Sequence, residues 1–424
     1  MRLLALAIGV PCALLFGASV AIASESTDRS VDADVLTRPR PEYDPIGIRL
    51  GSVFLYPSVT AGLGYNDNVF NNSGKLGDYF YSLAPALNVQ SAWSRHALNL
   101  AIGSKSYWFS NEESENRTDW NFDGSLRLDV MRGTDIKLNV HLADLHEARG
   151  TELPGGLGPG AAAEPTSYSR TGFSGEFGHT LNRMRLSVGG AWDVLDYDDV
   201  DVIQPALLPT LNNDDRDRTD TSVFVKAAYE VSDNTAVFLR GRVEDHDFDA
   251  LLDDDGFNRD SSGWGVDGGV EFRMTHVLTG ELFAGYTQRT YDDAAFDEAS
   301  QFGFGAGLKW FPSMLTTVSI DAARTIEDTS ITASSGYLST RGQLGVDHEL
   351  LRNVILSGRL GYQNAEYLDV VRNDDILSGA LSGRYLINHN LHFEAGWEYI
   401  DRSSNAAAFD YSSSQFLLSI TGKM

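Results

Sequence analysis

The densest carboxylate groups in the sequence form two neighbouring runs, Asp245 to Asp249 and Asp253 to Asp255, the second followed by Gly256. Carboxylates at alternate positions before a glycine begin a calcium-binding EF-hand loop, which also needs an acidic twelfth residue. Counting back from Gly256 puts Leu251 first and Ser262 twelfth, so no EF-hand is present. We therefore predict no specific metal site and no cofactor. Weak divalent-ion binding by exposed acidic loops stays open, beside the simpler alternative of a solvated, repelling surface.

Two histidines have an aspartate close by in the chain, His146 with Asp144 and His246 with Asp245, and could perform acid–base chemistry. A hydrolase would also need a nucleophile, and no serine stands in a recognisable nucleophile motif. The sequence therefore predicts a protein that is not an enzyme.

Other charged side chains recur on one face of segments that alternate apolar and polar residues, as where Val237 and Leu239 alternate with Arg240 and Arg242. Opposed charges on the wall of a pore create a field that selects polar solutes, and aromatic rings there could stack on sugars. The alternative is that the charges pair across neighbouring strands and that the rings pack locally. The candidate pore-lining residues are Arg127, Lys226, Arg240, Arg242, Lys309, Arg341, Arg359, Arg384, Asp267, Glu271, Glu394 and Glu398, and the candidate sugar-stacking residues are Phe224, Phe238 and Phe283.

Strands must position these residues. From about residue 52 onward, stretches of about 12 to 15 residues with period-2 alternation are separated by turns. The turns are alternately short, as at Met131 to Thr134, and long and acidic, as at Asp198 to Asp215. This alternation is typical of an antiparallel transmembrane β-barrel with short periplasmic turns and long extracellular loops. We predict about 18 strands, with 16 to 18 plausible, whose apolar face contacts lipid and whose polar face lines the lumen.

Composition agrees with a barrel, because 42% of residues are hydrophobic and no apolar stretch beyond the N-terminal segment approaches the roughly 20 residues of a membrane-spanning helix. The formal net charge of −26 argues against nucleic acid as a partner, since phosphates need basic contacts. We expect outer-membrane lipid to be the partner of the apolar face.

The N-terminus carries the features of a secretory signal peptide, with Arg2, an apolar run from Leu3 to Val20 and the small-residue site Ala21 to Ala23. Pro11 and Gly17 within the run disfavour a single anchoring helix. We assign residues 1–23 to a cleaved signal peptide.

Residues 24–51 are polar and interrupted by prolines, and we expect a mobile periplasmic tail there. Residues 52–424 form the barrel. The only cysteine, Cys12, lies within the signal peptide, so the mature chain should have no thiol or disulfide.

Two features of the strands bear on the membrane. Aromatic residues gather near both ends of the strands, as in the girdles of membrane barrels: Tyr229, Phe272, Trp310 and Tyr385 near short turns, and Trp192, Tyr286, Tyr362 and Tyr399 toward long loops. The last strand, from Tyr411 to Met424, resembles the C-terminal signal that hands outer-membrane barrels to their assembly machinery. It ends in Met424 where an aromatic residue is usual.

The run from Arg38 to Arg49 (RPRPEYDPIGIR), leading into a strand that ends in Gly64 to Phe70 (GYNDNVF), resembles the outer-membrane family called putative β-barrel porin type 2. Trp93 to Leu98 and Val346 to Asn353 are further matches. Some related barrels belong to exopolysaccharide secretion systems, so the resemblance implies an outer-membrane channel for an exported glycan. We expect an exopolysaccharide export channel that works with periplasmic export proteins. The alternatives are a general diffusion porin for small polar solutes and a closed structural surface barrel.

Overall fold

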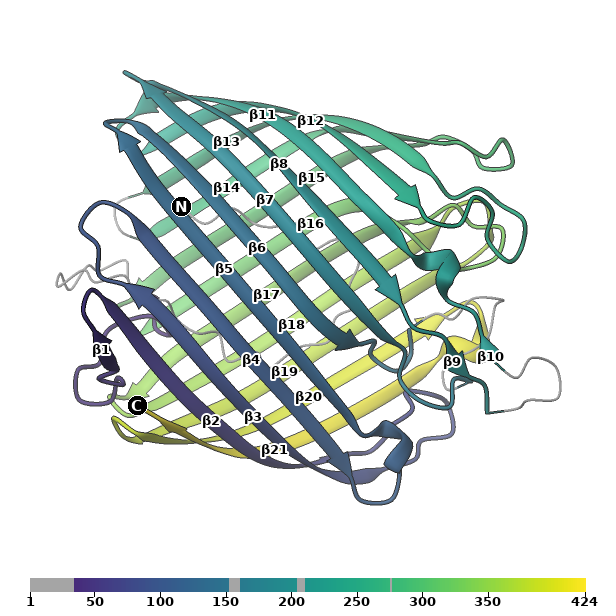
Figure 1. Ribbon diagram of the computed structural model, residues 1–424, viewed down its shortest axis with the longest axis horizontal. Helices are drawn as coiled ribbons and strands as arrows, with labels where there is room; N and C mark the ends of the chain where they lie inside the picture. The colour runs from purple at the N-terminus through teal and green to yellow at the C-terminus, as the bar shows by residue number, and fades with distance from the viewer. Residues whose placement is uncertain (1–33, 152–160, 204–209, 275–276) are drawn as a thin grey trace.

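The chain forms one closed, antiparallel barrel of 18 long strands (Figure 1). The computed structural model describes residues 34–151, 161–203, 210–274 and 277–424. The barrel strands are β2 (Val53–Asn66), β3 (Asp78–Ser91), β4 (Ala97–Phe109), β5 (Arg117–Met131), β6 (Thr134–His146), β7 (Ser167–Leu181), β8 (Met184–Tyr197), β11 (Arg218–Ser232), β12 (Thr235–Phe248), β13 (Ser261–Met274), β14 (Leu278–Tyr291), β15 (Ala299–Ser313), β16 (Thr316–Glu327), β17 (Tyr337–Leu351), β18 (Val354–Tyr367), β19 (Asn373–Asn388), β20 (Leu391–Ser404) and β21 (Tyr411–Lys423). The shorter elements are β1 (Ile48–Leu50), β9 (Val200–Asp201), β10 (Thr210–Leu211) and the 3-10 turns η1 (Glu113–Glu115), η3 (Asp214–Arg216) and η4 (Ala407–Phe409).

Each barrel strand pairs with the next one along the chain, and β2 pairs with β21 to close the ring. The closing register runs from Ser58 opposite Lys423 to Asn66 opposite Gln415. Because closure leaves no unpaired edge, every strand satisfies its backbone hydrogen bonds within the wall. The predicted fold and strand number are confirmed.

Short and long connections lie at opposite ends of the barrel. The turn between β5 and β6 needs only Arg132 and Gly133, and Gly133 adopts a φ of +78° that side-chain-bearing residues avoid. The long connections carry β9, β10 and the 3-10 turns, which gather at the other end (Figure 1). The predicted alternation of short turns and long loops therefore places all short turns at one end of the barrel and the long loops at the other.

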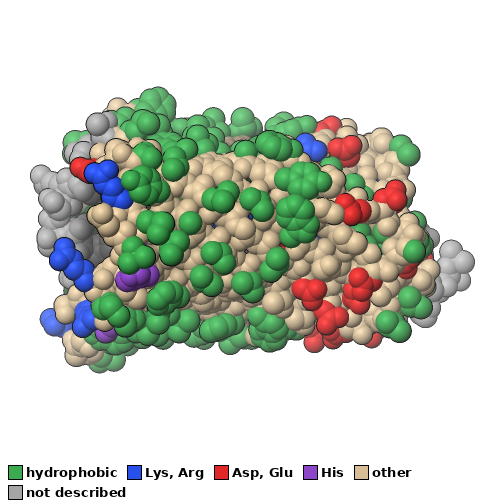
Figure 2. All heavy atoms as spheres, turned by 90° about the horizontal axis from the view of Figure 1, so that it is seen from above, with side chains coloured by type: hydrophobic (Ala, Val, Ile, Leu, Met, Phe, Trp, Pro, Cys, Tyr) green, Lys and Arg blue, Asp and Glu red, His purple; other side chains and the backbone are tan. Residues whose placement is uncertain are grey.

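The two faces of the wall differ as the alternation predicts. On β15, Phe302, Phe304 and Trp310 are exposed on the outside, while Gly303 and Gly305 are buried on the inside. Phe302 keeps 69% of its surface exposed. A continuous band of exposed apolar side chains of this kind is favourable in contact with lipid and unfavourable in water. Figure 2 shows this apolar band around the middle of the barrel, with carboxylates toward the long-loop end and Lys and Arg toward the short-turn end.

Aromatic residues of both predicted girdles project outward. Tyr229 and Tyr385 near the short turns and Trp192 and Tyr362 toward the long loops are each between 44% and 50% exposed. No helix in the described residues is long and apolar enough to span a membrane.

The predicted signal peptide, and residues 24–33 of the predicted tail, lie outside the described residues. Residues 34–45, the described part of the expected tail, contact the inner wall near the short turns. The mobility expected of the tail stays a prediction.

Candidate functional site

One long connection crosses the extracellular mouth of the barrel. We call residues 147–166, between β6 and β7, the mouth loop; its residues 147–151 and 161–166 are described. Glu147 forms an ion pair with Arg216 of η3 at 2.6 Å, and the Gly150 carbonyl accepts a hydrogen bond from Arg402 of β20 at 2.7 Å. Because β20 lies far around the ring from β6, these contacts carry the loop over the lumen.

A third contact fixes the same loop. Arg149 donates from Nε to both carboxylate oxygens of Glu115 in η1, at 3.1 and 3.0 Å, and from a terminal nitrogen to the Ala162 carbonyl at 2.7 Å. Glu115 is 1% exposed. A buried, multiply bonded guanidinium–carboxylate pair is rigid, so Arg149 and the described residues beside it have a defined position.

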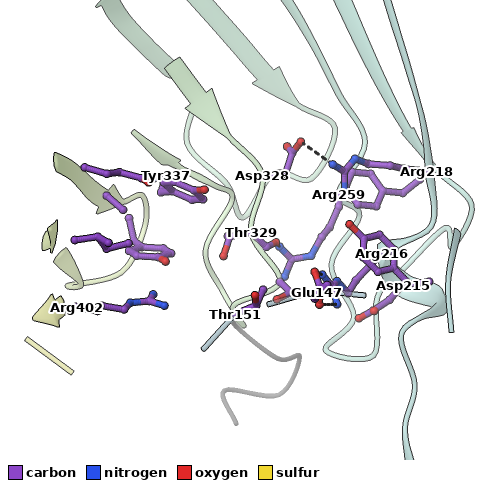
Figure 3. Close-up of a pocket in the computed structure, with 17 residues that line it drawn as sticks. Glu147, Thr151, Asp215, Arg216, Arg218, Arg259, Asp328, Thr329, Tyr337 and Arg402 are labelled. Atoms are coloured by element: carbon purple, nitrogen blue, oxygen red, sulfur yellow. Dashed lines mark hydrogen bonds and ion pairs between the residues drawn. The ribbon is translucent and has the colours of Figure 1, made fainter. Parts of the chain in front are cut away.

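The loops and strand ends leave a cavity of about 130 Å³ at this mouth, room for on the order of ten water molecules. Its walls come from the mouth loop, η3 and the loop after β16, and from strands on opposite sides of the barrel. Figure 3 shows Arg402 and Tyr337 on one side and Arg216, Arg218 and Asp215 on the other. The charged lining residues are Glu147, Asp215, Arg216, Arg218, Arg259, Asp328 and Arg402.

Beside this cavity, Asp220, His246 and Asp328 place one imidazole nitrogen and two carboxylates close enough to hold a metal ion. Their surroundings do not suit a cation. Arg289 donates to His246 Nε2 at 2.9 Å, so His246 carries its proton on Nδ1, 2.6 Å from Asp220. Arg218 and Arg289 also pair with the two carboxylates. These residues therefore form a salt-bridge network that holds the loop after β16 against the wall.

The electrostatics of the cavity lining differ between its carboxyl groups. Burial opposes ionisation of Asp328, but the neighbouring guanidinium groups of Arg289 and Arg218 outweigh it and hold its pKa well below the usual range. Burial, reinforced by Asp254, instead raises the pKa of Asp215 to about 6. Oδ1 of Asp215 is buried without a hydrogen-bond partner, so this carboxyl can change charge close to neutral pH.

Further along the lumen, the wall formed by β11 to β14 carries one cluster of predicted pore-lining residues. Asp267 of β13, 2% exposed, accepts hydrogen bonds from Arg240 at 3.1 and 3.0 Å and from Arg242 at 2.7 Å. Lys226 of β11 pairs with Glu271 at 2.5 Å and with Glu281 at 3.0 Å. Arg240 and Arg242 of β12 pair with the neighbouring strand β13, while Lys226 reaches past β12 to β13 and β14, so these charges tie several strands of the wall together.

The three predicted sugar-stacking rings lie on the same inner face, each over a glycine of a neighbouring strand. A Cβ added to Gly189, Gly269 or Gly305 would lie 2.6, 2.5 or 2.2 Å from Phe224, Phe238 or Phe283. Lys226 Nζ lies 3.8 Å from the ring centre of Phe238, and Arg240 lies 4.7 Å from that of Phe283. With a cation over two of the three rings, this placement favours packing within the wall.

The remaining predicted residues lie on the inner face of other strands and do not join that cluster. Arg359 pairs with Asp347 at 2.8 Å, and Arg384 pairs with Glu394 at 2.8 Å. Lys309 contacts Asp34 of the N-terminal segment at 2.6 Å. Arg127, Arg341 and Glu398 lie elsewhere on this face; the Arg127 side chain is 58% exposed although it pairs with Asp129. A role of these residues in selecting solutes stays a prediction.

Residues 40–424 match the family described as "Putative beta-barrel porin 2". The chain belongs to this porin family. The match begins at Arg40 and so includes residues 40–45 of the N-terminal segment that contacts the inner wall, as well as all strands of the barrel. No curated protein matches the chain.

Solved structures similar to this porin-family barrel share little sequence with it. OpdK of Pseudomonas aeruginosa, solved with vanillate, is 10% identical over 87% of this chain and 99% of that chain, with a TM-score of 0.41. OccK9 (OpdG) of the same species is 11% identical over 88% of this chain and 98% of that chain, with a TM-score of 0.44. A BenF-like porin from Pseudomonas fluorescens Pf-5 is 11% identical over 87% and 99%, with a TM-score of 0.43.

The sequence-based search for site residues in this porin missed the arginines of the mouth. Arg216, Arg218, Arg259 and Arg402 lie at strand ends or in loops, where no alternation marks an inward face. The local charge pattern could have found two of them. Arg216 and Arg218 are isolated basic residues within the acidic run from Asp214 to Asp220, and a basic residue in such a run indicates a specific carboxylate partner.

Proposed function

We propose that this porin-family barrel is a passive channel for small polar solutes in the outer membrane, inserted there by the barrel-assembly machinery. The observation that carries the proposal is the polar mouth, where arginine and carboxylate side chains from opposite sides of the barrel line a cavity of about 130 Å³. A mouth lined by charges of both signs favours hydrophilic solutes over apolar ones.

Inside the mouth the lumen offers a polar path. Asp123 and His141, paired on the inner face of β5 and β6, keep 51% and 34% of their side-chain surfaces exposed. Exposed charged groups on an inward face favour a water-filled interior over a packed, closed structural barrel.

Export of an exopolysaccharide, the function first expected from the sequence, would require the mouth loop to move aside. Its buried contacts with Glu115, Arg216 and Arg402 oppose that movement. The family match supplies no evidence for a glycan substrate or for periplasmic export proteins. A small-solute porin therefore accounts for more of the geometry.

The experiment is permeation by the purified full chain in planar bilayers and in liposomes that swell as solutes enter. We expect stable conductance and swelling with monosaccharides that falls steeply for trisaccharides. Absence of conductance would favour the closed structural barrel, and entry of long oligosaccharides would favour export.

A deletion strain provides the matching test in cells. Surface and periplasmic polysaccharide, quantified beside the complemented strain, should be unchanged. Loss from the surface with retention in the periplasm would overturn the small-solute proposal.

A further inference from the structure

The N-terminal segment, residues 34–45, lies against the inside of the barrel near the short turns; we call it the strap. It contacts five consecutive strands, β15 to β19. Asp34 pairs with Lys309 at 2.6 Å, and the backbone N–H of Val35 donates to Thr317 Oγ1 at 3.0 Å. Val35, 0% exposed, packs against Ile355 and Leu386.

One ion pair fixes the strap. Arg40, 3% exposed, donates to Glu349 of β17 at 2.8 Å and to the Val35 carbonyl at 2.7 Å. Arg38 and Arg352 also lie within 3.7 Å of the same carboxylate. Glu349 is therefore the single anion on which three guanidinium groups converge, and it joins the strap to the wall.

The strap is not a strand of the barrel. Its backbone–backbone hydrogen bonds join its own residues, from Arg38 to Asp34 and from Asp44 to Arg40. Its contacts with the wall are side-chain hydrogen bonds, ion pairs and one small apolar cluster. Such a unit can detach without breaking any strand pairing.

A glycine with a positive φ lies two residues after the strap. Gly47, between the strap and β1, adopts a φ of +74°, and an added Cβ would lie 2.6 Å from the ring of Tyr56. Glycine alone accommodates this conformation without strain. Rotation about this residue would move the strap while β1 stays paired with β2.

We propose that the strap is a gate at the periplasmic mouth, latched to the wall by Arg40 and Glu349, and that it swings about Gly47 to widen the lumen. The proposal rests on the channel function proposed above. The latch accounts for a buried arginine in an otherwise detachable segment.

The first test compares single-channel recordings of the full chain with those of Arg40→Ala and Glu349→Gln. Both variants should gain open time and mean conductance. Arg49→Ala is the matched control, because Arg49 lies just beyond Gly47 on exposed β1, where its Nε donates to the Gly51 carbonyl and its guanidinium lies 5.6 Å from the ring centre of Phe54. Heat-dependent migration on gels shows that each variant is folded.

The second test joins the strap to the wall covalently. Cysteines replacing Asp34 and Lys309 in a Cys12→Ser background are linked by a bismaleimide, so that no other thiol reacts. Linked channels should lose the high-conductance state that unlinked channels of the same variant show.

Three outcomes are distinct. Conductance that depends on the link supports the gate. Conductance that is equal in linked and unlinked channels, and in Arg40→Ala, overturns the gate and leaves the channel proposal standing. Absence of conductance in every folded sample, including the strap variants, would overturn both the channel proposal and the gate proposal.

Discussion

The carboxylate of Glu147 accepts two hydrogen bonds from the guanidinium of Arg216, at 2.6 and 3.1 Å. The two side chains are 10% and 12% exposed, so water competes little for this pair. It ties Glu147 of the mouth loop to η3, shortly before β11, and both side chains line the cavity.

Glu147→Gln should therefore widen the mouth. Removing one partner of a buried ion pair costs about 3–5 kcal/mol, enough to release a loop held by a few contacts. We expect higher single-channel conductance and faster liposome swelling with disaccharides. Glu164→Gln changes the same charge in the same loop; an equal increase there would show that charge, and not release of the loop, is the cause.

The ion selectivity of the channel should depend on pH near 6. Burial and Asp254 raise the pKa of Asp215 to about 6, so its charge in the cavity appears as pH rises through that value. The ratio of cation to anion permeability, from reversal potentials, should increase between about pH 5 and pH 7. Asp215→Asn should remove that increase. Asp217, whose pKa burial also raises to about 6, does not line the cavity, and Asp217→Asn should leave the increase in place.

The same group predicts the direction of stability with pH. Because the folded-state pKa lies above the usual value of 3.8, the folded chain holds a proton between about pH 4 and 6 that the unfolded chain has released. The contribution of Asp215 to the free energy of unfolding should therefore fall as pH rises through this window. Urea unfolding in lipid, compared with Asp215→Asn, measures this contribution; a rise with pH would contradict it.

Asp267 is the anion that neutralises Arg240 and Arg242 in the wall. Asp267→Asn should destabilise the barrel by about 3–5 kcal/mol, because it leaves two partly buried cations without their carboxylate. Adding Arg240→Ala and Arg242→Ala should restore much of that loss in urea unfolding experiments. If the triple variant is no more stable than the single one, the cluster does not act as a unit.

The Phe283 ring packs directly against Gly305, where a side chain would leave it no room. Gly305→Ala would bring a Cβ within 2.2 Å of that ring and should cost about 1–3 kcal/mol through displacement of the packed side chain. Gly342→Ala is the matched control, because nothing lies within 4 Å of its added Cβ. Equal unfolding free energies for the two variants would contradict the proposed packing of the ring.

The strands of this barrel could be predicted from sequence because each strand repeats one simple constraint. Val237 and Leu239 face lipid and Arg240 and Arg242 face the lumen, so a period of two residues fixes both the strand and its faces. The same constraint predicted the inner-face candidates on other strands. It could not tell whether their charges pair within the wall or face solutes, because pairing depends on register.

The mouth and the strap could not be predicted in that way. Arg40 and Glu349 are 309 residues apart, and Glu147 and Arg216 are 69 apart, with no periodic pattern at either end of these contacts. Their positions follow from the closed ring, which brings loops from distant parts of the chain together at each mouth. Loop contacts of this kind depend on the complete fold.

The pairing of β2 with β21 sets the order of assembly. The hydroxyl groups of Thr60 and Thr421 lie 2.8 Å apart across this seam although 361 residues separate them. The first barrel strand therefore has no final neighbour until the last one arrives, and its backbone groups would be unsatisfied in lipid until then. Insertion of the chain into the bilayer should consequently be a late, cooperative event. A chain truncated before β21 would have two unpaired strand edges and could not close the barrel.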